Sequence, residues 1–68
     1  MSARDRILEY VRDGRWHTTV EIADALGIDT NTVWAKLNSE EGWGYVENGG
    51  TVSSAERGGR TTKWRWLG

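Results

Sequence analysis

Two short amphipathic segments that meet at a glycine constrain this chain more than any other feature of its sequence. Aliphatic side chains recur at helical spacing on both sides of Gly27, and Val33 and Leu37 lie six and ten residues after it. A turn this tight needs a residue that tolerates positive φ, and helices that cross this closely need a small facing side chain. Gly27 and Ala23 fill these two roles, so the sequence predicts two helices packed against each other.

The length and composition of the chain exclude several classes of protein. Its 68 residues suffice for one small domain, which we expect to span residues 1–68. The absence of cysteine excludes a disulfide framework, and a single histidine, His17, argues against a structural zinc site. We therefore expect no metal and no cofactor. No apolar run approaches the ~20 residues of a membrane span, so we expect a soluble cytoplasmic protein with no membrane partner.

Charge is distributed unevenly along the chain, although the net charge is only −1. Residues 1–19 hold four arginines and three acidic residues, a balance of +1, and residues 20–48 hold one lysine and six acidic residues, a balance of −5. Residues 49–68 hold four basic residues and one acidic residue, a balance of +3. Because nucleic-acid-binding domains present clustered basic residues, this last segment is the candidate phosphate-binding surface.

Capping residues predict where three helices begin. We expect the first helix over about residues 3–13, the second over 19–26 and the third over 30–40, ending before Gly42. Between the first two helices, residues 15–18 have room for one edge strand or a tight link. The caps that we expect are Ser2 with Asp5, Thr18 with Glu21, and Asp29 with the backbone N–H groups of Asn31 or Thr32.

After the third helix, the periodicity of the sequence changes from helical to strand-like. Residues 45–52 and 61–67 favour two strands. Two glycine pairs, at positions 49–50 and 58–59, interrupt this region. Either pair can turn a hairpin. We place the main tip at residues 57–60 and interpret residues 48–50 as a bulge or a second turn.

The second of these strands alternates between two kinds of side chain. Trp64 and Trp66 fall on one face, and Lys63 and Arg65 fall on the other. We expect the two tryptophans to pack on the first or third helix as part of the core, because a small domain needs the area that they bury.

Three helices followed by a basic, glycine-punctuated hairpin resemble the winged helix-turn-helix domains of bacterial, archaeal and phage transcription regulators. The resemblance covers nearly the whole chain and is carried by EIADALGI, DTNTVWAKL, GYVE and the wing RGGRTTKWRWL. It implies an α+β fold of three helices and a carboxyl-terminal β-hairpin, and it allows a short strand between the first two helices. It also implies double-stranded DNA as the partner and transcription regulation as the role, with the third helix in the major groove and the wing on the backbone.

One position departs from the family pattern. The family usually has an aliphatic residue seven positions after the valine of the third helix, where this sequence has Glu40. We therefore expect the third helix to end early and Trp43 to replace the missing core contact. Glu40 and Glu41 are interpreted as a solvated helix end.

The outward side of the third helix and the basic wing supply the candidate DNA contacts. An asparagine such as Asn31 can pair with adenine, and threonine can contact a phosphate or a thymine methyl group. Trp34, at the border of the core face, fits a place under the wing, on DNA or in a dimer surface. The alternative interpretations are first-turn polar residues on the helix and an edge-protecting charge run on the wing. The candidate set is Thr19, Thr30, Asn31, Trp34, Lys36, Asn38, Arg57, Arg60, Lys63 and Arg65.

No pattern in the sequence resembles an active site, since it has no cysteine nucleophile and no glycine-rich phosphate loop after a strand. We therefore expect no enzyme and no catalytic residues. Two alternatives to transcription regulation stay open: an accessory DNA-binding role in phage recombination or packaging, and a winged helix that docks a protein through its acidic second and third helices. Because no long helix follows the wing, we expect a monomer or a weak dimer.

Overall fold

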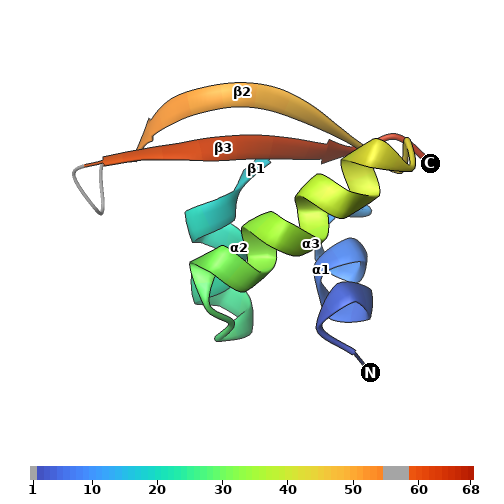
Figure 1. Cartoon of the computed structure of the whole chain (residues 1–68), viewed down its shortest axis with the longest axis horizontal. Coiled ribbons are helices and arrows are strands. Elements are labelled where there is room, and N and C mark those ends of the chain that lie inside the picture. The colour runs from blue at the N-terminus through green and yellow to red at the C-terminus, as the bar shows by residue number, and fades with distance from the viewer. Residues whose placement is uncertain (1, 55–58) are drawn as a thin grey trace.

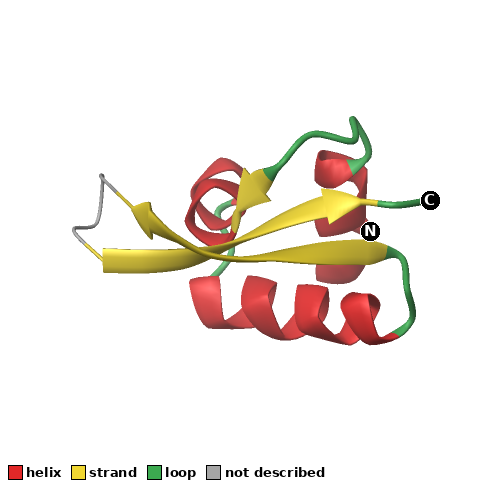
Figure 2. Cartoon of the chain, turned by 90° about the horizontal axis from the view of Figure 1, so that it is seen from above, coloured by secondary structure: helices red, strands yellow, loops and turns green. Residues whose placement is uncertain are grey.

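The computed structural model describes residues 2–54 and 59–68, which form three helices and one antiparallel sheet (Figure 1). The helices lie together on one face of the sheet, and the other face is open (Figures 1 and 2). This arrangement confirms the expected α+β fold, including the short strand between the first two helices. The elements in chain order are α1 (Ala3–Val11), β1 (His17–Thr18), α2 (Thr19–Leu26), α3 (Thr30–Gly42), β2 (Val46–Ser54) and β3 (Gly59–Trp66).

The sheet has the strand order β1–β3–β2, so β3 is its central strand. Trp64 on β3 lies opposite His17 on one side and Asn48 on the other. The register of β2 against β3 shifts between Asn48 and Thr51, which confirms the bulge expected at residues 48–50. Part of the tip expected at residues 57–60 lies outside the described residues, and the remainder, Gly59 and Arg60, begins β3.

All three helices begin at the predicted caps. Asp5 N donates to Ser2 Oγ over 3.2 Å, Glu21 N donates to Thr18 Oγ1 over 3.0 Å, and Asp29 caps α3. Gly27 ends α2 in the left-handed conformation with φ +66°, as the tight turn requires. The helix ends depart slightly from expectation, because α1 stops at residue 11 and α3 continues to residue 42.

The core lies between the three helices and the inner face of the sheet. Trp64 is its largest fully buried side chain, which confirms its predicted place, and its indole Nε1 donates to Thr19 Oγ1 over 2.8 Å. Trp66 is partly buried against this core. The buried apolar residues are Ile7, Leu8, Val11, Ile22, Ala23, Val33, Leu37, Val46 and Trp64.

The carboxyl-terminal end of α3 differs from the sequence prediction. Glu40 is 4% exposed, and Arg4 of α1 binds its carboxylate through Nε and through Nη2, the latter at 3.2 Å from Oε2. This ion pair compensates the buried charge of Glu40, and the helix continues two residues past it. Trp43 is 76% exposed, so the prediction that it fills a gap in the core is wrong, as is that of a solvated Glu40.

Aromatic side chains also gather near the carboxyl-terminal end of β3. The rings of Tyr45 and Trp66 stack at 6.2 Å, and the Arg12 guanidinium lies 5.6 Å from the centre of the Trp66 ring. Trp43 and Leu67, which are close to Tyr45 and Trp66 in the sequence, are also exposed. Within the described chain, no helix has the length and apolar character needed to cross a membrane.

Candidate nucleic-acid interface

A groove of about 330 Å³ separates the amino-terminal half of α3 from the hairpin. The start of α3 lies on the same side of the molecule as the end of β2 and the start of β3 (Figure 1). The walls are mostly polar, and the groove opens to solvent. Its lining residues are Thr19, Thr30, Asn31, Trp34, Thr51, Arg60, Thr61 and Thr62.

Five of the predicted contacts line this groove, Thr19 among them. Thr30, Asn31 and Trp34 reach it from α3, and Arg60 reaches it from β3, although about 30 positions of sequence separate the helix from the strand. Asn31 and Arg60 are exposed, and Trp34 is 47% exposed. Trp34 is therefore a groove-lining residue beside the hairpin and not part of the fully buried core.

The backbone at the start of α3 is already bonded within the chain. The Asp29 carboxylate accepts hydrogen bonds from Asn31 N over 2.9 Å and from Thr32 N over 3.4 Å. These amides are among those that a helix amino terminus otherwise offers to an anion. Contacts from this part of the groove consequently depend on side chains, which carry the donors and acceptors that distinguish one base from another.

Thr19 does not fit its predicted role as a DNA contact. It is 5% exposed, and its hydroxyl donates to Thr62 O over 3.1 Å while accepting from Trp64 Nε1. Both functions of the hydroxyl therefore serve the core, and Thr19 forms the floor of the groove. The sequence did not indicate this, because the partners lie more than 40 positions away.

The other predicted contacts lie outside the groove. Lys36 and Asn38 are exposed on α3 beyond the groove residues, and Arg57 lies outside the described residues. Lys63 and Arg65 face away from the core, as the alternation predicted, but both cations lie over the ring of Trp16. Arg65 also pairs with Glu47. Lys63 and Arg65 therefore belong to a group on the outer face of the sheet, separate from the groove.

Comparison with known proteins supports the architecture. No family model matches the sequence, and no curated protein matches it. A solved structure of a possible transcriptional regulator from Methanosarcina mazei Go1 is similar with a TM-score of 0.78 and 14% sequence identity. The similarity covers 100% of this chain and 57% of that chain, so this chain spans little more than half the length of that protein. The fold is that of a winged helix. In these terms β2 and β3 form the wing, and the groove lies between the wing and α3.

Trp16 is a residue of this region that the sequence analysis did not single out. Its ring lies on the outer face of the sheet, 4.7 Å from Lys63 Nζ and 4.7 Å from Arg65 Cζ, measured from the ring centre. Both distances fall within the range of cation–π attraction. A tryptophan placed just before a short strand, opposite alternating basic residues, was the signal available in the sequence.

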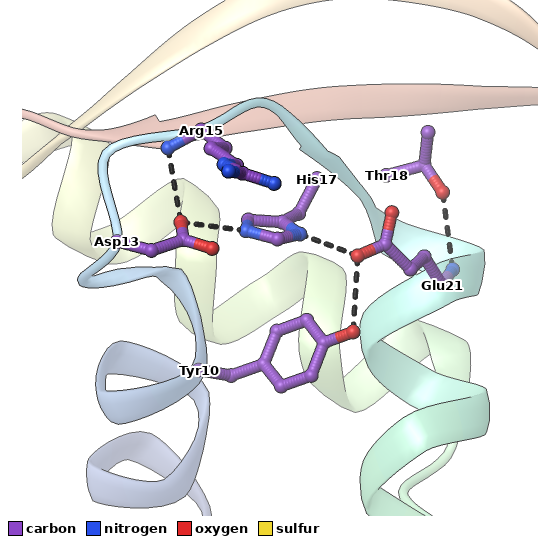
Figure 3. Close-up of polar contacts among 6 residues, drawn as sticks. All are labelled: Tyr10, Asp13, Arg15, His17, Thr18 and Glu21. Atoms are coloured by element: carbon purple, nitrogen blue, oxygen red, sulfur yellow. Dashed lines mark hydrogen bonds and ion pairs between the residues drawn. The ribbon is translucent and has the colours of Figure 1, made fainter.

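A charged cluster joins α1, β1 and α2 beside the wing (Figure 3). The imidazole of His17 lies between two carboxylates, with Nε2 2.8 Å from Asp13 Oδ1 and Nδ1 against Glu21 Oε2. The hydroxyl of Tyr10 donates to the same Glu21 oxygen over 3.0 Å, and its ring meets the imidazole edge-on. Only a protonated imidazole donates from both nitrogens, so this geometry fits the imidazolium. This arrangement gives His17 a structural role in the described chain.

The surroundings of His17 and Asp13 move their pKa values in opposite directions. Burial lowers the pKa of His17, but the hydrogen bonds and charges of Asp13 and Glu21 outweigh this effect and raise it above its ordinary value. The hydrogen bond from Arg15 N over 2.9 Å, followed by the bond from His17, lowers the pKa of Asp13. Within the described residues, no group of three or more His, Cys, Asp and Glu side chains is arranged to hold a metal ion.

The raised pKa of His17 predicts that the folded state loses stability as the solution becomes more alkaline. The contribution is fully present below the unfolded-state pKa of about 6.5 and is lost as the pH rises through the higher folded-state pKa. Urea denaturation of the wild type between about pH 6 and pH 8 should show a falling midpoint. In His17→Gln this pH dependence should flatten. A midpoint equally pH-dependent in both proteins would assign the effect to another group.

Proposed function

We propose that this chain is a DNA-binding module of a transcription regulator and that it binds duplex DNA in the groove between α3 and the wing. One observation carries the proposal: side chains suited to base contact and a cation suited to phosphate contact line the same groove. Thr30, Asn31 and Trp34 contribute the first kind, and Arg60 contributes the second. The similar fold of a possible transcriptional regulator gives independent support.

In this model α3 supplies base contacts and the wing supplies backbone contacts. Asn31 carries the amide that pairs with adenine in the major groove. Arg60, at the start of β3, lies across the groove and neutralises a phosphate. Binding rather than catalysis is the activity that we propose, and the strength of binding should depend on salt because phosphate contacts release counterions.

Two single variants separate base contacts from phosphate contacts. Against a site selected from random duplexes, Asn31→Ala should weaken binding by about 1–3 kcal/mol while binding to random duplex stays nearly unchanged. Arg60→Ala should weaken binding to all sequences and reduce the slope of log affinity against log salt by about 0.9. Fluorescence anisotropy across a salt series measures both effects.

Arg12→Ala is the matched control, because it removes the same charge outside the groove. Its salt slope should stay close to that of the wild type. If Arg60→Ala and Arg12→Ala change the slope equally, net charge rather than a local contact governs binding. If Asn31→Ala weakens selected and random duplexes equally, α3 does not read bases.

A second candidate function is docking of another protein at the opposite end of the molecule. The observation that favours it is the exposure of Trp43, Tyr45 and Leu67, at 76%, 42% and 54%. Large exposed apolar patches mark interaction surfaces. A labelled random duplex at low salt separates the two functions: absence of any binding by the wild type would reject the DNA-binding proposal and favour the docking surface.

A further inference from the structure

The ring of Trp16 rests directly on the backbone of the wing at Gly49. A Cβ atom added to Gly49 would lie 2.5 Å from Trp16 Cζ3, 2.6 Å from Lys63 Cε and 2.7 Å from Lys63 Cγ. Real Cβ atoms do not approach other atoms this closely, so a side chain at position 49 would displace Trp16 and Lys63 from their places. Trp16 immediately precedes β1, while Lys63 lies on β3 and Gly49 on β2. One side chain therefore reaches from the first edge of the sheet across its central strand to the other edge.

The contact falls at the bulge of the wing. The register shifts between Asn48 and Thr51, Gly50 has φ +86°, and Gly50 N donates to Asn48 Oδ1 over 2.8 Å. A bulge bends its strand and increases the local twist. The direction of the wing beyond this point, where Thr51 and Arg60 line the groove, therefore depends on how the bulge is held.

Residues 16–20 contact β3 at several points. From α2, Thr19 Oγ1 donates to Thr62 O and Val20 N donates to Thr61 Oγ1 over 3.3 Å. On the outer face of the sheet, Trp16 lies over Lys63 and Gly49. The two hydrogen bonds fix β3 to α2, but among the described residues β2 beyond the bulge pairs with β3 alone. Trp16 is the residue of this segment that also reaches β2, at Gly49.

We propose that Trp16 is a positioning residue for DNA binding, which holds the wing at the bulge so that Arg60 and the start of α3 line one groove. This inference rests on the proposed function. It assigns to Trp16 no contact with DNA, because its ring lies on the outer face of the sheet between Lys63 and Arg65. The cations attract the faces of the ring, and the absence of a side chain at Gly49 provides the space for it.

Two variants disturb the contact between Trp16 and Gly49, one at each residue. Trp16→Ala removes the ring, and Gly49→Ala displaces it. Residual dipolar couplings of the free protein should then show a changed orientation of the amides of residues 51–53 and 60–62 relative to the three helices. At a temperature at which both variants are fully folded, affinity for the selected duplex should fall at least about fivefold, the smaller end of the cost of one lost base contact. Trp16→Phe should recover part of this loss.

Matched controls and a double variant exclude a general loss of stability. Trp43→Ala removes an exposed tryptophan outside the groove, and Gly42→Ala adds a methyl group where no atom lies within 4 Å. Both should leave the couplings and the affinity unchanged. In the double variant Trp16→Ala with Gly49→Ala, the added Cβ no longer meets the ring, although it still meets the flexible Lys63 side chain, so Gly49→Ala should cost less affinity there than in the wild type.

Each outcome decides a separate claim. Unchanged couplings in both Trp16→Ala and Gly49→Ala would overturn the positioning role, whether or not the protein binds DNA. Changed couplings with unaltered affinity would also overturn it, since the wing would then move without consequence for binding. If the wild type fails to bind any duplex at low salt, the proposed function fails, and the couplings alone still show whether Trp16 orients the wing.

Discussion

Trp64→Ala should abolish cooperative unfolding at room temperature or lower the free energy of unfolding by about 3–5 kcal/mol. Trp64 is fully buried, and its loss leaves the hydroxyl of Thr19 without its indole donor. A domain of this size has a total stability of roughly 3–10 kcal/mol, so the loss is comparable with the whole. Circular dichroism during urea denaturation measures the change.

Trp43→Ala serves as the control for this substitution, because it removes the same side chain from a position that is 76% exposed. Its free energy of unfolding should stay within about 0.5 kcal/mol of the wild-type value. Equal destabilisation by the two variants would contradict the placement of Trp64 at the centre of the core.

Leu37→Ala should destabilise the fold by about 2–5 kcal/mol. Leu37 is fully buried on α3, on the same helix face as Val33, and both belong to one core cluster with the α2 residue Ala23. The cavity left by the substitution lies where two rigid helices cross, so the surroundings cannot easily close it. Thermal unfolding followed by circular dichroism measures the loss, and Leu67→Ala, at a 54% exposed position, is the control. An unchanged melting temperature would mean that α3 is rotated about its axis.

Local chemistry explains why the elements of this fold could be predicted from sequence. The caps at Ser2, Thr18 and Asp29 act within three residues of their partners, and the positive φ of Gly27 depends on that residue alone. The alternation around Trp64 likewise needs only the period of a strand. Each of these features depends only on residues that are close together in the sequence.

Contacts between distant residues explain the predictions that were wrong. Glu40 is buried because Arg4, 36 positions earlier, binds it, and nothing near Glu40 in the sequence indicates this partner. Glu40 thus occupies the buried position itself, and Trp43 stays exposed. Thr19 faces the core for a comparable reason, since its partners Thr62 and Trp64 belong to the last strand.

The candidate interface was predicted in part. Thr30, Asn31, Trp34 and Arg60 were proposed from helix geometry and charge, and they line one groove. The sequence does not show that Lys63 and Arg65 lie over an aromatic ring outside the groove, because this depends on the position of Trp16 above β3. A count of charges along the sequence cannot separate a cation that faces a groove from one that lies against an aromatic ring.

The bulge in β2 has a consequence for the behaviour of the protein in concentrated solution. β2 is a nine-residue strand at the edge of the sheet, and such an edge presents backbone donors and acceptors along which another chain can align. The shift in register between Asn48 and Thr51 breaks this row near its middle, leaving only short stretches in regular strand geometry. A second molecule therefore meets no long straight edge to extend. We therefore expect the irregularity that bends the wing also to disfavour edge-to-edge pairing with a second molecule.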